Sequence, residues 1–197
     1  MKTFFFTGLL VLKVFAYGQV AAVPDSMHLY RSIPEALLNP DRVYRLDLSR
    51  KKLTAIPPEV FQLKNLKTLS LSRNKIRVVP AGIGNLSNLE FLDISRNLLT
   101  FVPPEIGKLS SLKELILYQN EIDTIPSEIG QLSNLEKLDL WDNELSTLPE
   151  SIRNLKKLQV LDLRGILFNE KQQLYFRELL PGVTIYLSPG CNTCKDP

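Results

Sequence analysis

The chain has 197 residues, of which 44% are hydrophobic and 23% charged, which is enough apolar material for a sizeable core in one domain. Its formal charge is +3, and setting aside Lys2 and Lys13 near the amino terminus leaves 22 basic residues against 21 acidic ones. A nucleic-acid-binding protein usually has a clear basic excess, so this balance argues against that class.

Residues 1–18 have the composition of a secretory signal peptide. Lys2 precedes an apolar run over residues 4–12, and Ala16 and Gly18 place small residues where a signal peptidase acts. Cleavage after Gly18 is preferred, and cleavage after Ala22 is the alternative. A membrane anchor is less favoured, because the uninterrupted run is about half the ~20 residues that span a bilayer. We predict a secreted, periplasmic or cell-envelope protein without a transmembrane anchor.

Residues 19–42 should form an amino-terminal segment and cap. Ser32 and Glu35 have the spacing of a capping box, which predicts a short helix over residues 33–38. Pro40 ends that helix. We expect the helix to cover the open end of the structure that follows.

Residues 43–168 consist of six repeats with a period of 23 residues. They follow the pattern L-x-x-L-x-L-x-x-N-x-L-x-x-L-P-x-x-I-x-x-L-x-x. The repeats begin at Val43, Leu66, Leu89, Leu112, Leu135 and Leu158. One such unit cannot bury its apolar face alone, so neighbouring units must stack into a solenoid with a continuous core.

Each repeat contains two kinds of local pattern. The L-x-L alternation predicts a strand of a parallel sheet with its leucines inside, and the segment after the proline predicts a short helical turn on the convex side. An asparagine recurs between them and should bond buried backbone groups from the interior. These asparagines are Asn74, Asn97, Asn120 and Asn143.

Residues 169–188 should form a carboxyl-terminal cap of one helix and one strand. The helix is expected from Glu170 to Leu180, and the strand over residues 183–187. The helix residues expected to face inward are Leu174, Tyr175, Leu179 and Leu180.

Residues 189–197 form a tail with the chain's two cysteines, Cys191 and Cys194. The C-x-x-C spacing occurs in redox motifs and in half zinc sites, but here it has no following helix and no second pair. A local disulfide formed after export is the preferred interpretation. Pairing with another chain is the alternative.

The segments around the repeats carry a family resemblance. They are Pro34 to Leu37, Asn39-Pro40 and Val43 to Ser49 before the repeats, and Glu178 to Pro181 with Ile185-Tyr186 after them. Over about residues 30 to 188, the chain resembles leucine-rich repeat proteins of the 23-residue type, and more narrowly the small secreted members of spirochaetes and Bacteroidetes. The resemblance implies an α/β fold, a right-handed β/α horseshoe with a parallel concave sheet. It also implies protein binding and no catalytic residues.

Three rows of side chains should line the concave face, from the third, fifth and seventh positions of each repeat, with strands ~4.8 Å apart. Large apolar side chains and charges gather there in the third to fifth repeats, as at a binding hot spot. The residues expected to bind a protein or peptide partner are Phe91, Glu114, Ile116, Tyr118, Lys137, Asp139, Trp141 and Asp142. The alternative is that these aromatics are ordinary scattered surface residues.

Arg50, Arg73 and Arg96 share the eighth position of the first three repeats. They could steer an acidic partner to the amino-terminal half. A solvated edge that keeps the sheet soluble is an equally good interpretation.

Catalytic interpretations have little support. Asp139 and Asp162 lie side by side in the fifth-position row, but an open sheet beside Lys137 and Arg164 should keep both ionised. The chain has one histidine, His28, so neither a His-based triad nor a multi-histidine metal site can form. We expect no cofactor and a monomer. A glycan-acting enzyme using the Asp row, or a structural envelope protein, are the alternatives.

Overall fold

The computed structural model describes residues 27–189. The predicted signal peptide at residues 1–18 and the predicted pairing of Cys191 with Cys194 lie outside this range. No helix within residues 27–189 has the length and apolar composition to cross a membrane.

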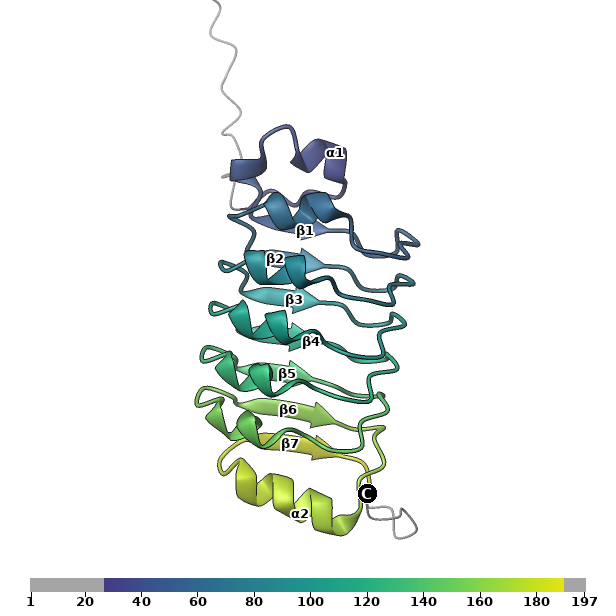
Figure 1. Cartoon of the computed structure of the whole chain (residues 1–197), viewed down its shortest axis with the longest axis vertical. Helices are drawn as coiled ribbons and strands as arrows, with labels where there is room; N and C mark the ends of the chain where they lie inside the picture. Colours follow the sequence, from purple (N-terminus) through teal and green to yellow (C-terminus); the bar gives the residue numbers. More distant parts are fainter. Residues whose placement is uncertain (1–26, 190–197) are drawn as a thin grey trace, which may run out of the picture.

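Seven parallel strands form one sheet in sequence order, so each coil of the chain lies beside the next (Figure 1). The strands are β1 (Arg45–Asp47), β2 (Thr68–Ser70), β3 (Phe91–Asp93), β4 (Glu114–Ile116), β5 (Lys137–Asp139), β6 (Val160–Leu163) and β7 (Thr184–Leu187). The register repeats without slippage, and Leu46 lies beside Leu69, which lies beside Leu92. The predicted parallel solenoid is confirmed.

The repeating leucines build a single core along the stack. Both leucines of the L-x-L pair are buried, as at Leu69 and Leu71, which have no exposed surface. Because every coil contributes the same positions, apolar surface left open by one coil is covered by the next.

Five 3-10 helices form the side of each coil opposite the sheet, confirming the predicted helical turns (Figure 1). They are η2 (Pro58–Gln62), η3 (Ala81–Asn85), η4 (Pro104–Lys108), η5 (Ser127–Gln131) and η6 (Glu150–Asn154). A proline precedes each one in extended or nearly extended backbone, as at Pro103 with φ −71° and ψ 150°. Each buries one apolar side chain, such as Ile129, against the core.

The asparagine row lies inside the structure as predicted. The Asn120 side chain accepts a hydrogen bond from the Leu99 N–H and donates to the carbonyls of Ile94 and Leu117. Asn97 repeats this arrangement one coil earlier, with donation to Leu71 and Ile94. These amides therefore pair backbone groups of two neighbouring coils where the chain leaves each strand.

The eighth residue of each repeat, in the turn after the strand, has a left-handed backbone conformation. This occurs at Arg50, Arg73, Arg96, Gln119 and Asp142, with φ from 54° to 57°, and at Gly165 with φ 78°. Positive φ is uncommon outside glycine, so a repeating turn imposes it here. The turn directs the following loops to one edge of the solenoid.

The amino-terminal cap contains α1 (Ile33–Ala36) and η1 (Pro40–Arg42). Ser32 accepts a hydrogen bond from the Glu35 N–H, as expected for its N-cap position. The helix ends two residues before the predicted Leu38, which is 77% exposed and has no core to pack against. Tyr30 forms a parallel bridge with Leu46 and extends the sheet beyond β1.

The carboxyl-terminal cap contains α2 (Glu170–Leu179) followed by β7. Asn169 and Gln172 form a complete capping box at the start of α2. The predicted inward face was wrong in part, because Leu174 is 61% and Tyr175 45% exposed. Phe176 is buried in their place, and its ring meets that of Phe168 at 4.8 Å between centroids. Leu180 is buried and Leu179 packs against the core, as predicted.

Candidate partner-binding surface

The outward-facing residues of the strands form two registered rows on the concave face, and the seventh-position residues just after the strands form a third, in which the Arg96 N–H donates to the Tyr118 carbonyl and the Gln119 N–H to the Trp141 carbonyl. The third-position row runs through Phe91, Glu114 and Lys137, and the fifth-position row through Asp93, Ile116 and Asp139. The cap strand β7 extends these rows, since Tyr186 pairs with Asp162. The predicted rows are therefore present, with one member more than the six repeats supply.

Tyr118 and Trp141 stack on each other two residues after the ends of β4 and β5, along the edge of this face where the chain leaves the strands. Their ring centroids lie 5.5 Å apart with the planes inclined by 36°. The backbone fixes this neighbourhood, because the Gln119 N–H donates to the Trp141 carbonyl at 2.8 Å. Both side chains are half-buried, so each retains accessible surface. Aromatic pairs of this kind present a rigid amphipathic contact area.

Arg96 extends the stack on the amino-terminal side. Its guanidinium carbon lies 5.7 Å from the centroid of the Tyr118 ring, a cation–π distance. The Arg96 Nε is buried and has no hydrogen-bond partner among the residues that the structure describes. The sequence did not reveal this contact, although the seventh and eighth positions of adjacent repeats place the two residues at the same edge.

Ile116 does not belong to the exposed patch that we expected. It is only 7% exposed, whereas Phe91 is half-buried. Ile116 occupies the middle of the three rows, with Asp93 and Asp139 beside it on the neighbouring strands. The remaining residues, which we call the aromatic surface, are Phe91, Tyr118 and Trp141 with Glu114, Lys137, Asp139 and Asp142.

The charged members of the aromatic surface differ in exposure. Glu114, Lys137 and Asp139 are half-buried, and Asp142 is exposed. The side-chain amide of Gln119 donates to a carboxylate oxygen of Asp142 at 3.3 Å. The charged members of the aromatic surface are thus three acids and one base, and Arg96 against the Tyr118 ring is a second base beside it.

The aspartates of the fifth-position row have a structural role. Each accepts a hydrogen bond from the backbone N–H two residues later: Ser49 to Asp47, Ser95 to Asp93, Trp141 to Asp139 and Arg164 to Asp162. These bonds hold the turn at the end of each strand. The recurrence of aspartate is therefore explained without catalysis.

Asp162 is further committed to an ion pair. The Arg164 Nη2 donates to its Oδ2 at 2.6 Å, and the carboxyl is almost fully buried. Arg164 also lies over the Tyr186 ring, 5.3 Å from its centroid. The carboxylate pair considered for an enzyme thus consists of Asp162, which is neutralised by Arg164, and Asp139, which forms no salt bridge with any residue of the described range 27–189.

Burial raises the pKa of the Asp139 carboxyl above its ordinary value; the hydrogen bond from the Trp141 N–H opposes the rise, and the negative charge of Asp162 adds to it. The folded chain therefore binds this proton more tightly than the unfolded chain. The ionised carboxylate costs stability above the raised pKa, and the cost disappears as the pH falls below the ordinary value of 3.8.

Replacing Asp139 by asparagine should raise the melting temperature at pH 7, because the neutral amide can still accept the Trp141 N–H. The gain should shrink as the pH is lowered through the interval between the raised pKa and the ordinary one. Thermal melts across this interval measure it. Asp41→Asn, exposed in η1, controls for the loss of one negative charge, and an equal gain in both variants would contradict the local explanation.

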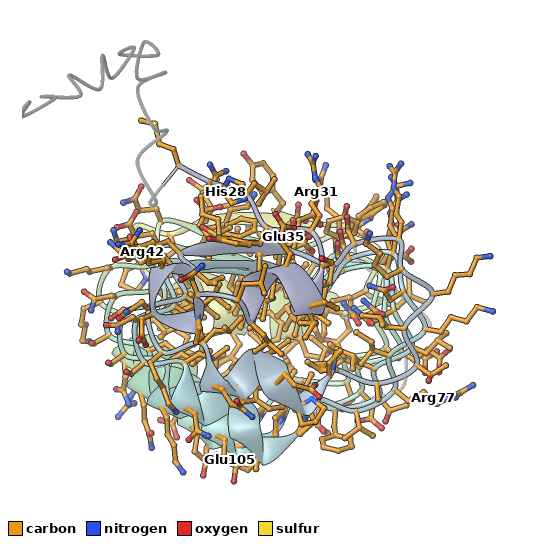
Figure 2. The ribbon with its side chains drawn as sticks, turned by 90° about the horizontal axis from the view of Figure 1, so that it is seen from above. His28, Arg31, Glu35, Arg42, Arg77 and Glu105 are labelled. Atoms are coloured by element: carbon orange, nitrogen blue, oxygen red, sulfur yellow. The ribbon has the colours of Figure 1, made fainter. Side chains whose placement is uncertain are left out.

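Within the described residues no group of three or more His, Cys, Asp or Glu side chains could hold a metal ion. His28 lies at the amino-terminal cap, where its ring contacts Tyr30 and its Nε2 lies 3.3 Å from a carboxylate oxygen of Glu35 (Figure 2). An open pocket of about 540 Å³ lies between the sixth coil and the carboxyl-terminal cap. Its lining includes Arg153, Lys156 and Val183 but no residue of the aromatic surface.

The fold and this surface place the protein in the class of repeat solenoids that present an open concave sheet. Two family profiles match the chain: leucine rich repeat over residues 41–99 and leucine-rich repeat region over residues 104–173. The chain belongs to the leucine-rich repeat proteins, which are usually non-catalytic scaffolds and typically bind proteins. A comparison with curated proteins finds no match.

The solved structures similar to this chain include two bacterial proteins. A leucine-rich repeat protein of Leptospira interrogans has 34% identity and a TM-score of 0.66, over 83% of this chain and 49% of that one. An internalin (inlF) from Listeria monocytogenes has 21% identity and a TM-score of 0.67, over 81% of this chain and 46% of that one, and it supports the fold alone. The chain therefore spans about half the length of either protein.

Proposed function

We propose that the protein is an exported, non-catalytic module that binds a protein or peptide partner through the aromatic surface. The observation that carries the proposal is the Tyr118–Trp141 stack, in which two large half-buried rings occupy equivalent positions of adjacent coils, just after β4 and β5. Binding energy at interfaces is concentrated in such aromatic anchors near the centre of the contact.

The residues around the Tyr118–Trp141 stack favour binding of a specific partner over nonspecific hydrophobic association. Glu114, Lys137, Asp139 and Asp142 place charges of both signs around the rings. A polar rim around an apolar centre excludes water from the centre and selects the partner's charge pattern. The sheet itself is held by backbone pairing and the asparagine row, so the rings are presented with little loss of backbone entropy on binding.

Capture experiments with the mature protein as bait test this proposal. The double substitution Tyr118→Ala with Trp141→Ala should weaken capture of the partner at least about thirtyfold, which corresponds to about 2 kcal/mol. The baits are incubated with the proteins of the native cell surface or surroundings, and the captured partner is then titrated against each variant.

Lys108→Ala is the matched control, because Lys108 is exposed on η4, on the other side of the coil. Melting curves by circular dichroism must accompany the titrations, since both rings are half-buried. Normal capture by a folded double variant, together with weakened capture by Lys108→Ala, would place the partner on the convex side and refute the proposal.

Export of the protein is the second part of the proposal. Its support is the charged and apolar pattern of residues 1–18 and the small residues Ala16 and Gly18. Mass spectrometry of the protein recovered from its native host should find a new amino terminus at Gln19, or at Val23 for the alternative cleavage. An intact Met1 in protein from the cytosol would contradict export.

A further inference from the structure

The loops that leave the strands divide one edge of the solenoid into two halves of opposite charge. In the first three loops, residues 50–55, 73–78 and 96–101, every charged residue is basic. In the next two, residues 119–124 and 142–147, every charged residue is acidic. The basic half comprises Arg50, Lys51, Lys52, Arg73, Lys75, Arg77 and Arg96, and the acidic half Glu121, Asp123, Asp142 and Glu144.

These charges are not neutralised within the described part of the chain. Elsewhere on the surface, Glu90 forms ion pairs with Lys67 and Lys113, and Glu150 pairs with Arg153. No salt bridge within residues 27–189 joins a member of either half to another residue. All of these side chains are exposed except Arg96, and Arg77 points away from the coil at this edge (Figure 2).

The same edge also carries exposed apolar side chains near its middle. Val78 is 49% and Phe101 42% exposed, and they occupy the same position in the second and third loops. Phe101 forms a parallel bridge with Thr124, the corresponding residue of the fourth loop. The edge therefore has an apolar part next to the boundary between its halves, and charged parts on both sides.

The basic half of this edge is complementary in charge to the acidic half of the same edge on a second copy. A second copy, turned by a two-fold axis through the boundary between the third and fourth loops, would place its fifth loop opposite the second and its fourth opposite the third. Lys75 would then face Glu144 of the other copy, and the same contact would recur on the other side of the axis. Contacts made twice around a two-fold axis are the rule in homodimers.

We propose that this edge is an interface with a second copy of the same chain, arranged antiparallel, in place of the monomer expected from the sequence. A polyanion would fit the basic half but would be repelled by the acidic half. A partner with both signs in the reverse order matches the second to fifth loops, and a second copy is such a partner. Its sixth loop, residues 165–170, has one charged residue, Glu170, to face the three basic residues of the first loop. The edge shares Asp142 with the aromatic surface, but the inference rests on the charges of the five loops and not on the identity of the partner that the aromatic surface binds.

The test measures the mass of the mature chain in solution by sedimentation velocity. A dimer should form at about 50 mM salt and dissociate at about 0.5 M, because exposed charges attract over a Debye length that salt shortens. Lys75→Glu and Glu144→Lys should each weaken the dimer about tenfold or more, since like charges then face each other. Lys108→Glu, on η4, should leave it unchanged.

Mixing the two single variants gives the decisive result. In an antiparallel heterodimer, the lysine introduced in one chain faces the glutamate introduced in the other, and the second contact has its native residues. The mixture should therefore dimerise as the unchanged protein does, although neither variant does so alone. A chain that stays monomeric at low salt, a mixture that does not recover, or a monomer that binds only a polyanion such as heparin would each overturn the proposal.

Discussion

Replacing Phe168 by alanine should lower the free energy of unfolding by about 4 kcal/mol. Phe168 is 1% exposed and meets the Phe176 ring edge-on, at 4.8 Å between centroids and 78° between planes. The substitution removes both the apolar burial and the contact that fixes α2 on the last coil. Because a repeat protein is stabilised by neighbour contacts, a loosened cap exposes the sixth coil as well.

Urea unfolding followed by the fluorescence of Trp141, the chain's one tryptophan, measures this change. The neighbouring Leu167 is the control, because it is 69% exposed and its replacement by alanine should cost less than about 0.5 kcal/mol. Equal losses in the two variants would mean that the cap does not depend on the buried pair of rings.

The fold was predictable because the same residues determine which positions become neighbours and which of them face the core. A period of 23 residues fixes which positions become neighbours, and the alternation within L-x-L fixes which of them face inward. The row through Phe91, Glu114 and Lys137 could therefore be predicted from the sequence. The start of α2 was predictable for a similar reason, since Asn169 and Gln172 satisfy a local capping rule.

The face of α2 was not predictable from periodicity. Its apolar residues, Leu174, Tyr175, Phe176, Leu179 and Leu180, cover so wide an arc that the helical period does not select one side. Tertiary packing decides, and the Phe168 ring selects Phe176. Leu174 and Tyr175 are left exposed as a consequence.

The candidate surface was predictable in position but not in its interactions. The seventh-position row placed Tyr118 beside Trp141, but the stacking of Arg96 on Tyr118 depends on the left-handed turn at Arg96. The ion pair between Asp162 and Arg164 likewise depends on side-chain conformation. The separation of basic and acidic loops along the edge is present in the sequence. It becomes evident when all six residues of each loop are compared, and not when one repeat position is followed from coil to coil.

Replacing Asn120 by alanine should lower the free energy of unfolding by about 3 kcal/mol, because several buried backbone groups lose their partner at once. The Asn120 Oδ1 accepts from the Leu99 N–H at 3.1 Å, and its Nδ2 donates to the carbonyls of Ile94 at 3.1 Å and Leu117 at 2.8 Å. These groups belong to adjacent coils in the middle of the stack. Their loss therefore weakens the junction on which the coils at both ends depend.

Asn88→Ala provides a matched control for Asn120→Ala. The Asn88 Nδ2 also donates to a backbone carbonyl of the preceding coil, that of Lys64 at 2.9 Å, but the pair is exposed and water can replace it. We expect a loss below about 0.5 kcal/mol for Asn88→Ala in the same urea titration. Similar losses for the two variants would show that the interior asparagine bonds add no more than a solvent-exposed one. A clear difference would mean that the buried ladder, and not the number of asparagine bonds, holds successive coils in register.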